Sequence, residues 1–422
     1  MHPLATSHRR APYFLPGLLG LIAFILALPL PAADAPAAEP AAIRIGVTGP
    51  FTGASSPMGI SMREGIRIAA AEINASGGLL GRPLQLLERD DEASNERGAR
   101  LIQELIDKDR IVAGLGIVNT GVALASQRHY QLARIPVITS VATGSLITRQ
   151  FLPPEFPDNY VFRVSANDEL QARVIVKEAI DRRGLGRLAI FHDATNYGVQ
   201  GSEDLIAALK ERGIAPVAVE RFQLRQVDMS ALLAQARAAG AEAVLTYGIG
   251  PELAYIANDM ARMNWRVPII GSWTLAMSNF IDSAGPHAEG ARMPQTFIQD
   301  AENPRQQAFL EAWRQSTGLE RIPVPPAAAQ GYDSMLLLAA AIRQAGSVEG
   351  SRIHAALEDL RAPVHGVIMT YRQPFSRTRH ETLTLPSQVP LGEVRNGRVV
   401  FAYEAERKRA IGLSPPDGGA RP

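Results

Sequence analysis

The sequence predicts an α/β protein built on parallel β-sheets. Short runs rich in β-branched residues alternate with stretches whose apolar residues recur at helical spacing. This strand and helix alternation continues along most of the 422 residues, and it places helices on both faces of parallel sheets. The 36 glycines and 30 prolines fit many short connections between the elements. The chain is long enough for two or three domains, each with its own core.

The expected strands share a high content of valine, isoleucine and leucine, and most are separated by a helical pattern. Such continuous apolar runs are typical of strands that are covered on both faces. In chain order they are Ile43–Val47, Leu84–Glu88, Ile111–Leu115, Val137–Thr139, Leu188–His192, Pro216–Phe222, Ala243–Tyr247 and Val267–Gly271.

Two of the expected helices begin after a residue that favours the N-cap position. Asn167 precedes the helical pattern at Asp168–Arg183, and Asp228 precedes the pattern at Met229–Ala239. Two further patterns, at Met58–Ile73 and Ala327–Ala341, predict an amphipathic helix and a buried helix.

Charge and cysteine content exclude several classes of protein. The 43 Lys and Arg residues nearly balance the 42 Asp and Glu residues and are spread along the chain, which argues against a nucleic-acid-binding surface. Cysteine is absent, so there is no disulfide, thiolate metal ligand or cysteine nucleophile. A lipid anchor attached to cysteine is excluded for the same reason.

The N-terminus has the pattern of a secretory signal peptide. Arg9 and Arg10 precede an apolar stretch from Tyr13 to Leu30, and small residues follow it. A membrane anchor is the alternative, but proline and glycine interrupt the stretch, and spanning needs about 20 apolar residues. We therefore expect residues 1–37 to be removed during export to the periplasm by the general secretory route. Residues 413–422 are rich in proline and glycine, and we expect a disordered tail.

Polar loops follow three strands of the first predicted sheet. In open α/β sheets the loops after the strand carboxyl ends face the ligand crevice. The loop after Val47 holds Ser55, the loop after Leu115 holds Asn119, and the loop after Thr139 is similar. Each precedes a helix, so its polar groups lie near free backbone N–H groups and the positive end of a helix dipole. This predicts an anion site, the alternative being ordinary helix N-caps.

Several short motifs occur in a fixed order along the chain. They are Ile43–Gly53, Ala71–Leu84, Asp90–Glu92, Ile135–Ile138, His192–Asp193 before Tyr197–Gly198, and Gly331–Asp333. Each is weak alone, but the ordered set resembles the leucine/isoleucine/valine-binding family of bacterial solute-binding proteins. The resemblance covers about Ile43 to Tyr403.

The resemblance implies the type I periplasmic binding fold. This is an α/β fold of two doubly wound parallel-sheet lobes, joined by three crossovers, with a ligand cleft between them. We expect the crossovers near Arg163–Ser165, Pro294–Thr296 and Thr370–Arg372. Lobe 1 then consists of residues 38–164 and 296–371, and lobe 2 of residues 165–295 and 372–412.

The resemblance also implies which loops hold a ligand carboxylate. Family members use the loops that match Asn119–Gly121 and Val141–Thr143 here. We expect Asn119, Thr120 and Thr143 to contact the carboxylate, together with the backbone of Val141 and Ala142.

The rest of the implied site departs from the amino-acid-binding pattern. Trp273 stands where amino-acid binders of the family have a glutamate for the ligand ammonium. Asp168 and Glu252 are alternative anionic partners, although each also suits the first turn of a helix. Met58 and Tyr197 could form an apolar wall with Trp273, and core packing is the alternative for Met58. These substitutions favour a carboxylate with an apolar or aromatic body and no strict need for an α-amino group.

No catalytic, cofactor or metal motif is present. The segment from Gly114 to Asn119 lacks the third glycine of a dinucleotide fingerprint, and there is no P-loop, His-Glu-x-x-His or Gly-x-Ser-x-Gly motif. Asp90 and Asp91 point to opposite sides of a strand, and the eight histidines are scattered. We therefore expect no catalytic residues, no cofactor and no metal site.

The expected function is that of a monomeric periplasmic receptor. It would bind a small organic carboxylate, either an amino acid or an aromatic or aliphatic acid, by lobe closure and deliver it to an inner-membrane ABC permease. Three alternatives stay open. They are an amide- or urea-type ligand, a sensory subunit, and an enzyme that uses the same cleft for hydrolysis.

Overall fold

The computed structural model describes residues 41–300 and 303–413. The predicted signal peptide and residues 414–422 of the predicted tail lie outside the described residues. Among the described helices, none combines the length and the apolar character needed to cross a membrane.

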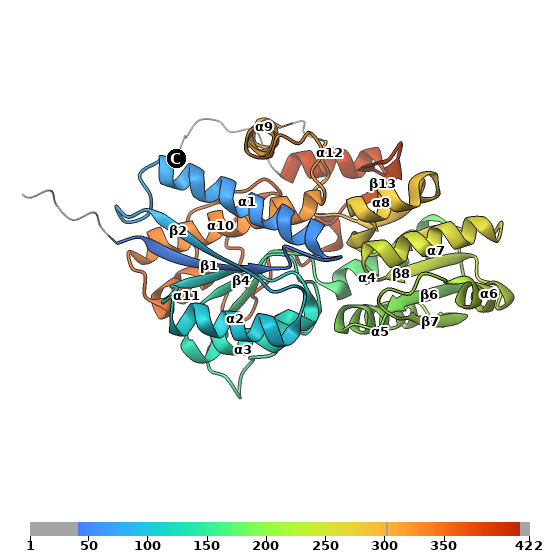
Figure 1. The fold of residues 1–422 in the computed structure, drawn as a ribbon, viewed down its shortest axis with the longest axis horizontal. Coiled ribbons are helices and arrows are strands. Elements are labelled where there is room, and N and C mark those ends of the chain that lie inside the picture. The colour runs from blue at the N-terminus through green and yellow to red at the C-terminus, as the bar shows by residue number, and fades with distance from the viewer. Residues whose placement is uncertain (1–40, 301–302, 414–422) are drawn as a thin grey trace, which may run out of the picture. The chain divides into compact units, whose positions relative to one another are not determined.

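The first sheet has five parallel strands in the order β2-β1-β3-β4-β5 (Figure 1). Helix α1 packs against α10, and α2 packs against α3, on opposite faces of this sheet. The strands are β1 (Ile43–Gly49), β2 (Leu84–Asp90), β3 (Ala113–Gly116), β4 (Val137–Thr139) and β5 (Val161–Arg163). The helices of this part are α1 (Ser56–Ala75), α2 (Asn95–Asp107), α3 (Thr120–Ala133), α9 (Pro304–Thr317), α10 (Pro325–Ala345) and α11 (Gly350–Glu358).

The second sheet has seven strands in the order β14-β13-β10-β9-β8-β6-β7. Its strands β6 to β10 pair in parallel, whereas β13 pairs antiparallel with both β10 and β14. The strands are β6 (Leu188–Asp193), β7 (Ala218–Phe222), β8 (Ala243–Tyr247), β9 (Ile269–Gly271), β10 (Arg292–Pro294), β13 (Leu391–Arg395) and β14 (Arg398–Phe401). The helices are α4 (Asp168–Lys177), α5 (Asn196–Lys210), α6 (Ser230–Ala238), α7 (Gly250–Arg262), α8 (Ser278–Ala284) and α12 (Glu404–Leu413).

Short elements complete the described chain. A two-stranded ladder joins β11 (Val364–His365) to β12 (Thr370–Tyr371). Helix α4 continues as a π-helical turn at Glu178–Arg182, and single 3₁₀ turns lie at Ile147–Arg149, Trp273–Ala276, Gly285–Ala288 and Pro386–Gln388.

Two glycines allow α1 and α10 to pack backbone to backbone. A Cβ atom on Gly65 of α1 would lie 2.0 Å from the carbonyl oxygen of Ala328, and one on Gly331 of α10 would lie 2.2 Å from that of Met62. Gly331 therefore has a packing reason for its place inside a helix, where glycine is otherwise unfavourable.

All eight predicted strands are confirmed, with ends that move by up to two residues. The N-cap at Asn167 is also confirmed, because its side chain accepts a hydrogen bond from the Leu170 N–H at 2.7 Å. The N-cap at Asp228 is wrong. Met229 is the capping residue, and the Asp228 carboxylate accepts from the Ser230 N–H at 2.9 Å.

The chain leaves the first sheet after Arg163, the last residue of β5, and α4 then packs against α5 and β10 of the second sheet. The third crossover between the two sheets differs from the one expected at Thr370–Arg372. Glu381 still forms a parallel β-bridge with Arg163, and the chain joins the second sheet only at Leu391. The chain around Glu381 therefore still lies beside the first sheet, and the sequence holds no local sign of this pairing.

Candidate ligand-binding site

The loop after β4 meets the N-terminus of α4. The Asp168 N–H donates to the carbonyl oxygen of Thr143 at 2.9 Å, and the Glu169 N–H donates to Ser145 Oγ at 3.0 Å. Thr143 and Asp168, both candidates from the sequence, are thus neighbours. Both are buried.

The three polar loops of the first sheet hydrogen-bond to one another. Thr120 begins α3, and its Oγ1 accepts from the Gly144 N–H at 3.2 Å. Asn119 Nδ2 donates to Ser55 Oγ at 3.2 Å, while Asn119 Oδ1 has no partner among the described residues. The loops after β1, β3 and β4 therefore form one polar edge, as predicted.

Two tyrosines reach this edge from the second sheet. Tyr197 donates from its hydroxyl to Ser272 Oγ at 2.6 Å, and the rings of Tyr197 and Tyr247 lie 5.4 Å apart. The Tyr247 hydroxyl donates to the carbonyl oxygen of Asp168 at 3.2 Å. Both tyrosines are buried, so the carboxyl ends of β6 and β8 help to enclose Asp168.

Asp168 is fully buried, and its carboxyl Oδ2 has no partner among the described residues. Burial raises the pKa of Asp168 to about 8, the nearby Asp204 acts in the same direction, and the Thr143 hydrogen bond and Arg163 oppose the shift. The side chain is therefore mostly a neutral acid at pH 7. A ligand cation beside it would favour the charged form.

Trp273 lies on the second-sheet side of a narrow pocket. Its backbone N–H donates to Gln171 Oε1 at 3.1 Å, and its indole Nε1 has no partner in the described part of the chain. Gln295 Oε1 and Gln330 Oε1 are also buried without partners. The pocket is lined by Thr143, Ala166, Gln171, Trp273, Pro294, Gln295, Thr296, Pro326, Gln330 and Val389.

Glu252 and Met58 are not brought to this pocket. Glu252 Oε1 accepts from the Arg225 N–H at 2.6 Å, so its carboxylate orders the loop after β7. Met58 packs in the large apolar cluster that contains Met62 and Ile66. Glu252 therefore matches its alternative interpretation as a residue in the first turn of a helix. Met58 matches its alternative interpretation as a core residue.

Val141 and Ala142 are buried behind the polar edge. The Ala142 N–H donates to the Ile117 carbonyl at 3.1 Å, and its carbonyl accepts from Ser165 Oγ at 2.9 Å. The backbone of Ala142 is therefore engaged within the fold, contrary to the expectation that it would face a ligand carboxylate.

Sequence reasoning did not find Gln171, Gln330 or Tyr247. Tyr247 is the last residue of a predicted strand, so applying the strand-end rule to the second sheet would have indicated it. Gln330 follows three alanines in the predicted buried helix, so a polar side chain at this position is itself a signal of a polar site. Gln171 lies four residues after the Asn167 cap, and its contact with the Trp273 backbone could not be anticipated.

Comparison with known proteins gives a consistent result. A family model described as periplasmic binding protein matches residues 42–397. A "Leu/Ile/Val-binding protein homolog 2" from Brucella abortus is 28% identical over 317 residues, covering 75% of this chain and 82% of that protein. An "Amino acid binding protein" from Pseudomonas aeruginosa is 29% identical over 216 residues, covering 51% of this chain and 56% of that protein.

Solved structures share the fold. A periplasmic binding protein type 1 from Bordetella pertussis has a TM-score of 0.75 at 26% identity, covering 85% of this chain and 99% of that chain. A Rhodopseudomonas palustris solute-binding protein in complex with benzoate has a TM-score of 0.73 at 22% identity, covering 86% and 95%. At 22% identity, the match to the Rhodopseudomonas palustris structure shows only that the fold is shared.

Proposed function

Because this chain belongs to the periplasmic binding protein family, we propose that it is the solute receptor of an ABC transporter of the branched-chain amino-acid type. Its ligand would be a small organic carboxylate, either an amino acid or an aromatic or aliphatic acid, held between the two sheets. The curated relatives are named for amino-acid binding, and three polar loops on one sheet edge provide a place for a carboxylate.

The observation that carries this proposal is a group of buried polar atoms without partners around one pocket. Trp273 Nε1, Gln295 Oε1 and Gln330 Oε1 belong to side chains that line it. A buried unpaired polar atom costs about 1–3 kcal/mol, so several in one place indicate a polar site. The cavity measures about 10 Å³, so the two lobes would have to open for an organic acid to enter.

The carboxylate end of the ligand would lie at Thr120 and Thr143. Thr120 begins α3, where backbone N–H groups and the helix dipole favour an anion. The Thr143 side chain can donate a charge-assisted hydrogen bond to the same group.

The other end of the ligand would face Trp273, and here we propose that an α-amino group is not required. Indole offers an N–H donor and a π-face but no negative charge. Asp168 is the remaining candidate for an ammonium partner, but it lies beside Thr143, and its raised pKa of about 8 leaves it mostly neutral. A neutral carboxyl group and an indole N–H can both donate hydrogen bonds, so they would pair with oxygen atoms of the ligand.

A thermal-shift screen across amino acids, aromatic acids, aliphatic acids and amides tests the proposal. A ligand at about 100 times its Kd stabilises the folded state by about 2.7 kcal/mol, which gives a measurable rise in Tm. We expect carboxylates to raise Tm and to be recovered unchanged. Stabilisation by amides alone would reject the carboxylate site, and product formation would show an enzyme.

Export and partner are part of the same proposal. N-terminal sequencing of periplasmic material should find a terminus between Ala33 and Glu39, because the small residues there suit signal peptidase. Intact Met1 on most of the exported protein would contradict this. Uptake of the ligand should fall when the receptor is deleted, whereas a sensory subunit would leave uptake unchanged.

A further inference from the structure

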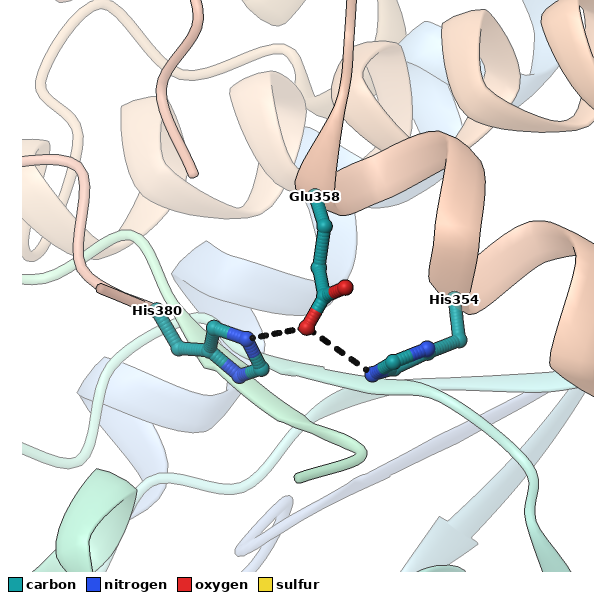
Figure 2. Close-up of side chains that lie close together, drawn as sticks. All are labelled: His354, Glu358 and His380. Atoms are coloured by element: carbon teal, nitrogen blue, oxygen red, sulfur yellow. Dashed lines mark hydrogen bonds and ion pairs between the residues drawn. The ribbon is translucent and has the colours of Figure 1, made fainter. Parts of the chain in front are cut away.

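Two histidines and a glutamate that the proposed function does not use meet in one cluster. His354 and Glu358 lie one turn apart on α11, and His380 reaches them from the segment beside β5, as Figure 2 shows. The Nε2 atoms of His354 and His380 lie 3.3 and 3.1 Å from the same atom, Glu358 Oε1. One ligand atom from each residue lies within 4.8 Å of the other two.

The His380 ring is fixed in the orientation that a metal ligand needs. Its Nδ1 lies 3.0 Å from the carbonyl oxygen of Val161, and since a carbonyl only accepts, Nδ1 carries the proton. The ring also stacks on Phe162, with 4.1 Å between the centroids. Its Nε2 faces Glu358 Oε1, and either a proton on Nε2 or a metal ion between the two atoms would hold them together. A carbonyl on the far nitrogen is a common support for histidine ligands.

His354 is held in a similar way. Its ring stacks on Tyr160, with 4.3 Å between the centroids. Its Nε2 lies 3.1 Å from the carbonyl oxygen of Asn159 as well as near Glu358, so without a metal this nitrogen carries a proton between two acceptors. Binding of a metal ion at His354 Nε2 would move that proton to Nδ1 or release it.

The cluster has an entry path. Both histidines are buried, whereas the Glu358 side chain is 18% exposed. Glu358 and His380 line a pocket of about 500 Å³, whose wall also carries Arg149, Arg377 and Arg379. A water or a small anion could therefore occupy a fourth coordination position.

We propose that His354 Nε2, His380 Nε2 and Glu358 Oε1 bind one Zn²⁺ ion. Two imidazoles and one carboxylate are ordinary zinc ligands, and Zn–N and Zn–O bonds of about 2.0–2.2 Å place tetrahedral donor atoms about 3.3–3.5 Å apart. The two distances to Glu358 Oε1, 3.1 and 3.3 Å, need changes of only a few tenths of an ångström. The two Nε2 atoms lie within 4.8 Å of each other and would have to approach to the same donor separation. The ion would join α11 to the segment beside β5, as a structural clamp.

The test uses the mature protein without a polyhistidine tag, since such a tag binds zinc itself. After treatment with a chelator, the protein is titrated with ZnCl₂ by calorimetry, and its Tm is measured with and without zinc. We expect one Zn²⁺ per chain and a rise in Tm. Glu358→Gln and His380→Asn should each weaken zinc binding at least about tenfold. His287→Gln is the matched control, because His287 is exposed and bonded to Asn258 outside the cluster.

Absorption by Co²⁺ in the wild-type protein provides a second readout that does not depend on variants folding. A tetrahedral site gives intense visible bands, which Zn²⁺ should abolish by displacement. Failure of the wild-type protein to take up zinc or cobalt would overturn the proposal and leave a histidine–glutamate hydrogen-bond cluster. Zinc uptake that both variants retain in full would overturn it as well.

Discussion

Arg163 Nη1 lies 3.1 Å from the carbonyl oxygen of Thr143 and donates a hydrogen bond to it. The same nitrogen donates to the Gly144 carbonyl at 2.6 Å, and Nη2 pairs with the Glu381 carboxylate. The Arg163 side chain is fully buried. One guanidinium thus fixes the loop of the candidate carboxylate site against the bridge that ends the first sheet.

This relationship predicts that Arg163→Met destabilises the protein by about 3–5 kcal/mol, because it leaves the half-buried Glu381 carboxylate without its positive partner. It should also weaken ligand binding, since Thr143 loses its support. Denaturation and calorimetry check the two effects. Glu381→Gln keeps a hydrogen-bonding side chain but leaves the fully buried Arg163 charge without its negative partner, so it should destabilise the protein to a similar extent. An unchanged free energy of unfolding in either variant would contradict the role given to this ion pair.

Asp168 predicts a pH dependence of stability in the ligand-free protein. Its folded-state pKa of about 8 lies above the ordinary carboxyl value of 3.8, so between these values the folded state keeps a proton that the unfolded state loses. Stability from this group is full below about pH 4 and falls as pH rises toward 8, by up to about 1.4 kcal/mol per pH unit.

Asp168→Asn should remove this loss, because an amide does not ionise. The Tm of the variant relative to the wild type should therefore increase from pH 5 to pH 8. Asp228→Asn is the control, since hydrogen bonds from Ser230 lower the pKa of this exposed carboxyl and its effect lies at acid pH. Parallel Tm profiles for wild type and Asp168→Asn would contradict the burial argument.

Much of the fold follows from local sequence patterns. The runs that became β1 and β8 are long and apolar enough to be recognised. By contrast, β5 and β10 were not predicted, because an arginine in each of these three-residue strands interrupts the apolar run. The pairing of Arg163 with Glu381 joins residues 218 positions apart, and no local propensity encodes it.

Only part of the candidate site could be predicted from the sequence, because contacts between distant segments leave no local pattern. Strand-end loops can be located from the sequence, and the folded chain brings Thr120 to the loop of Thr143, as the hydrogen bond from the Gly144 N–H to Thr120 Oγ1 shows. Glu252 was misplaced because its carboxylate is used by the nearby Arg225 backbone, which only the folded loop reveals. The zinc cluster was missed because His380 is 22 positions from Glu358, far from any metal-binding spacing.

Side-chain truncation at the two ends of the pocket should have different effects. Trp273→Ala removes a stacking surface and should weaken an aromatic ligand by about 1–3 kcal/mol. Thr143→Val keeps the shape but loses the hydroxyl, and it should weaken every carboxylate ligand by about 1–3 kcal/mol. Calorimetry with one aromatic and one aliphatic acid separates the two. An equal loss for both acids in Trp273→Ala would argue against stacking.

Ligand binding should close the two lobes on each other. Ser145 Oγ donates to Asp204 Oδ2 at 2.6 Å, and Asn279 Nδ2 donates to the Ala54 carbonyl at 3.1 Å. Each contact joins a loop of the first sheet to a helix of the second, so opening would break both. Small-angle scattering should show a smaller radius of gyration at ligand saturation. An unchanged radius would remove closure from the mechanism.

The most direct test of the ligand-binding account is calorimetry on matched acids that differ only in the α-amino group. Phenylpropionate is compared with phenylalanine, and isocaproate with leucine, at pH 7. We infer that Trp273 stands where amino-acid binders of the family have a glutamate, and Asp168 is mostly neutral. The account therefore predicts that the acids without an amino group bind at least as tightly as the amino acids. Binding by the amino acids alone would contradict it and would assign the ligand ammonium to Asp168.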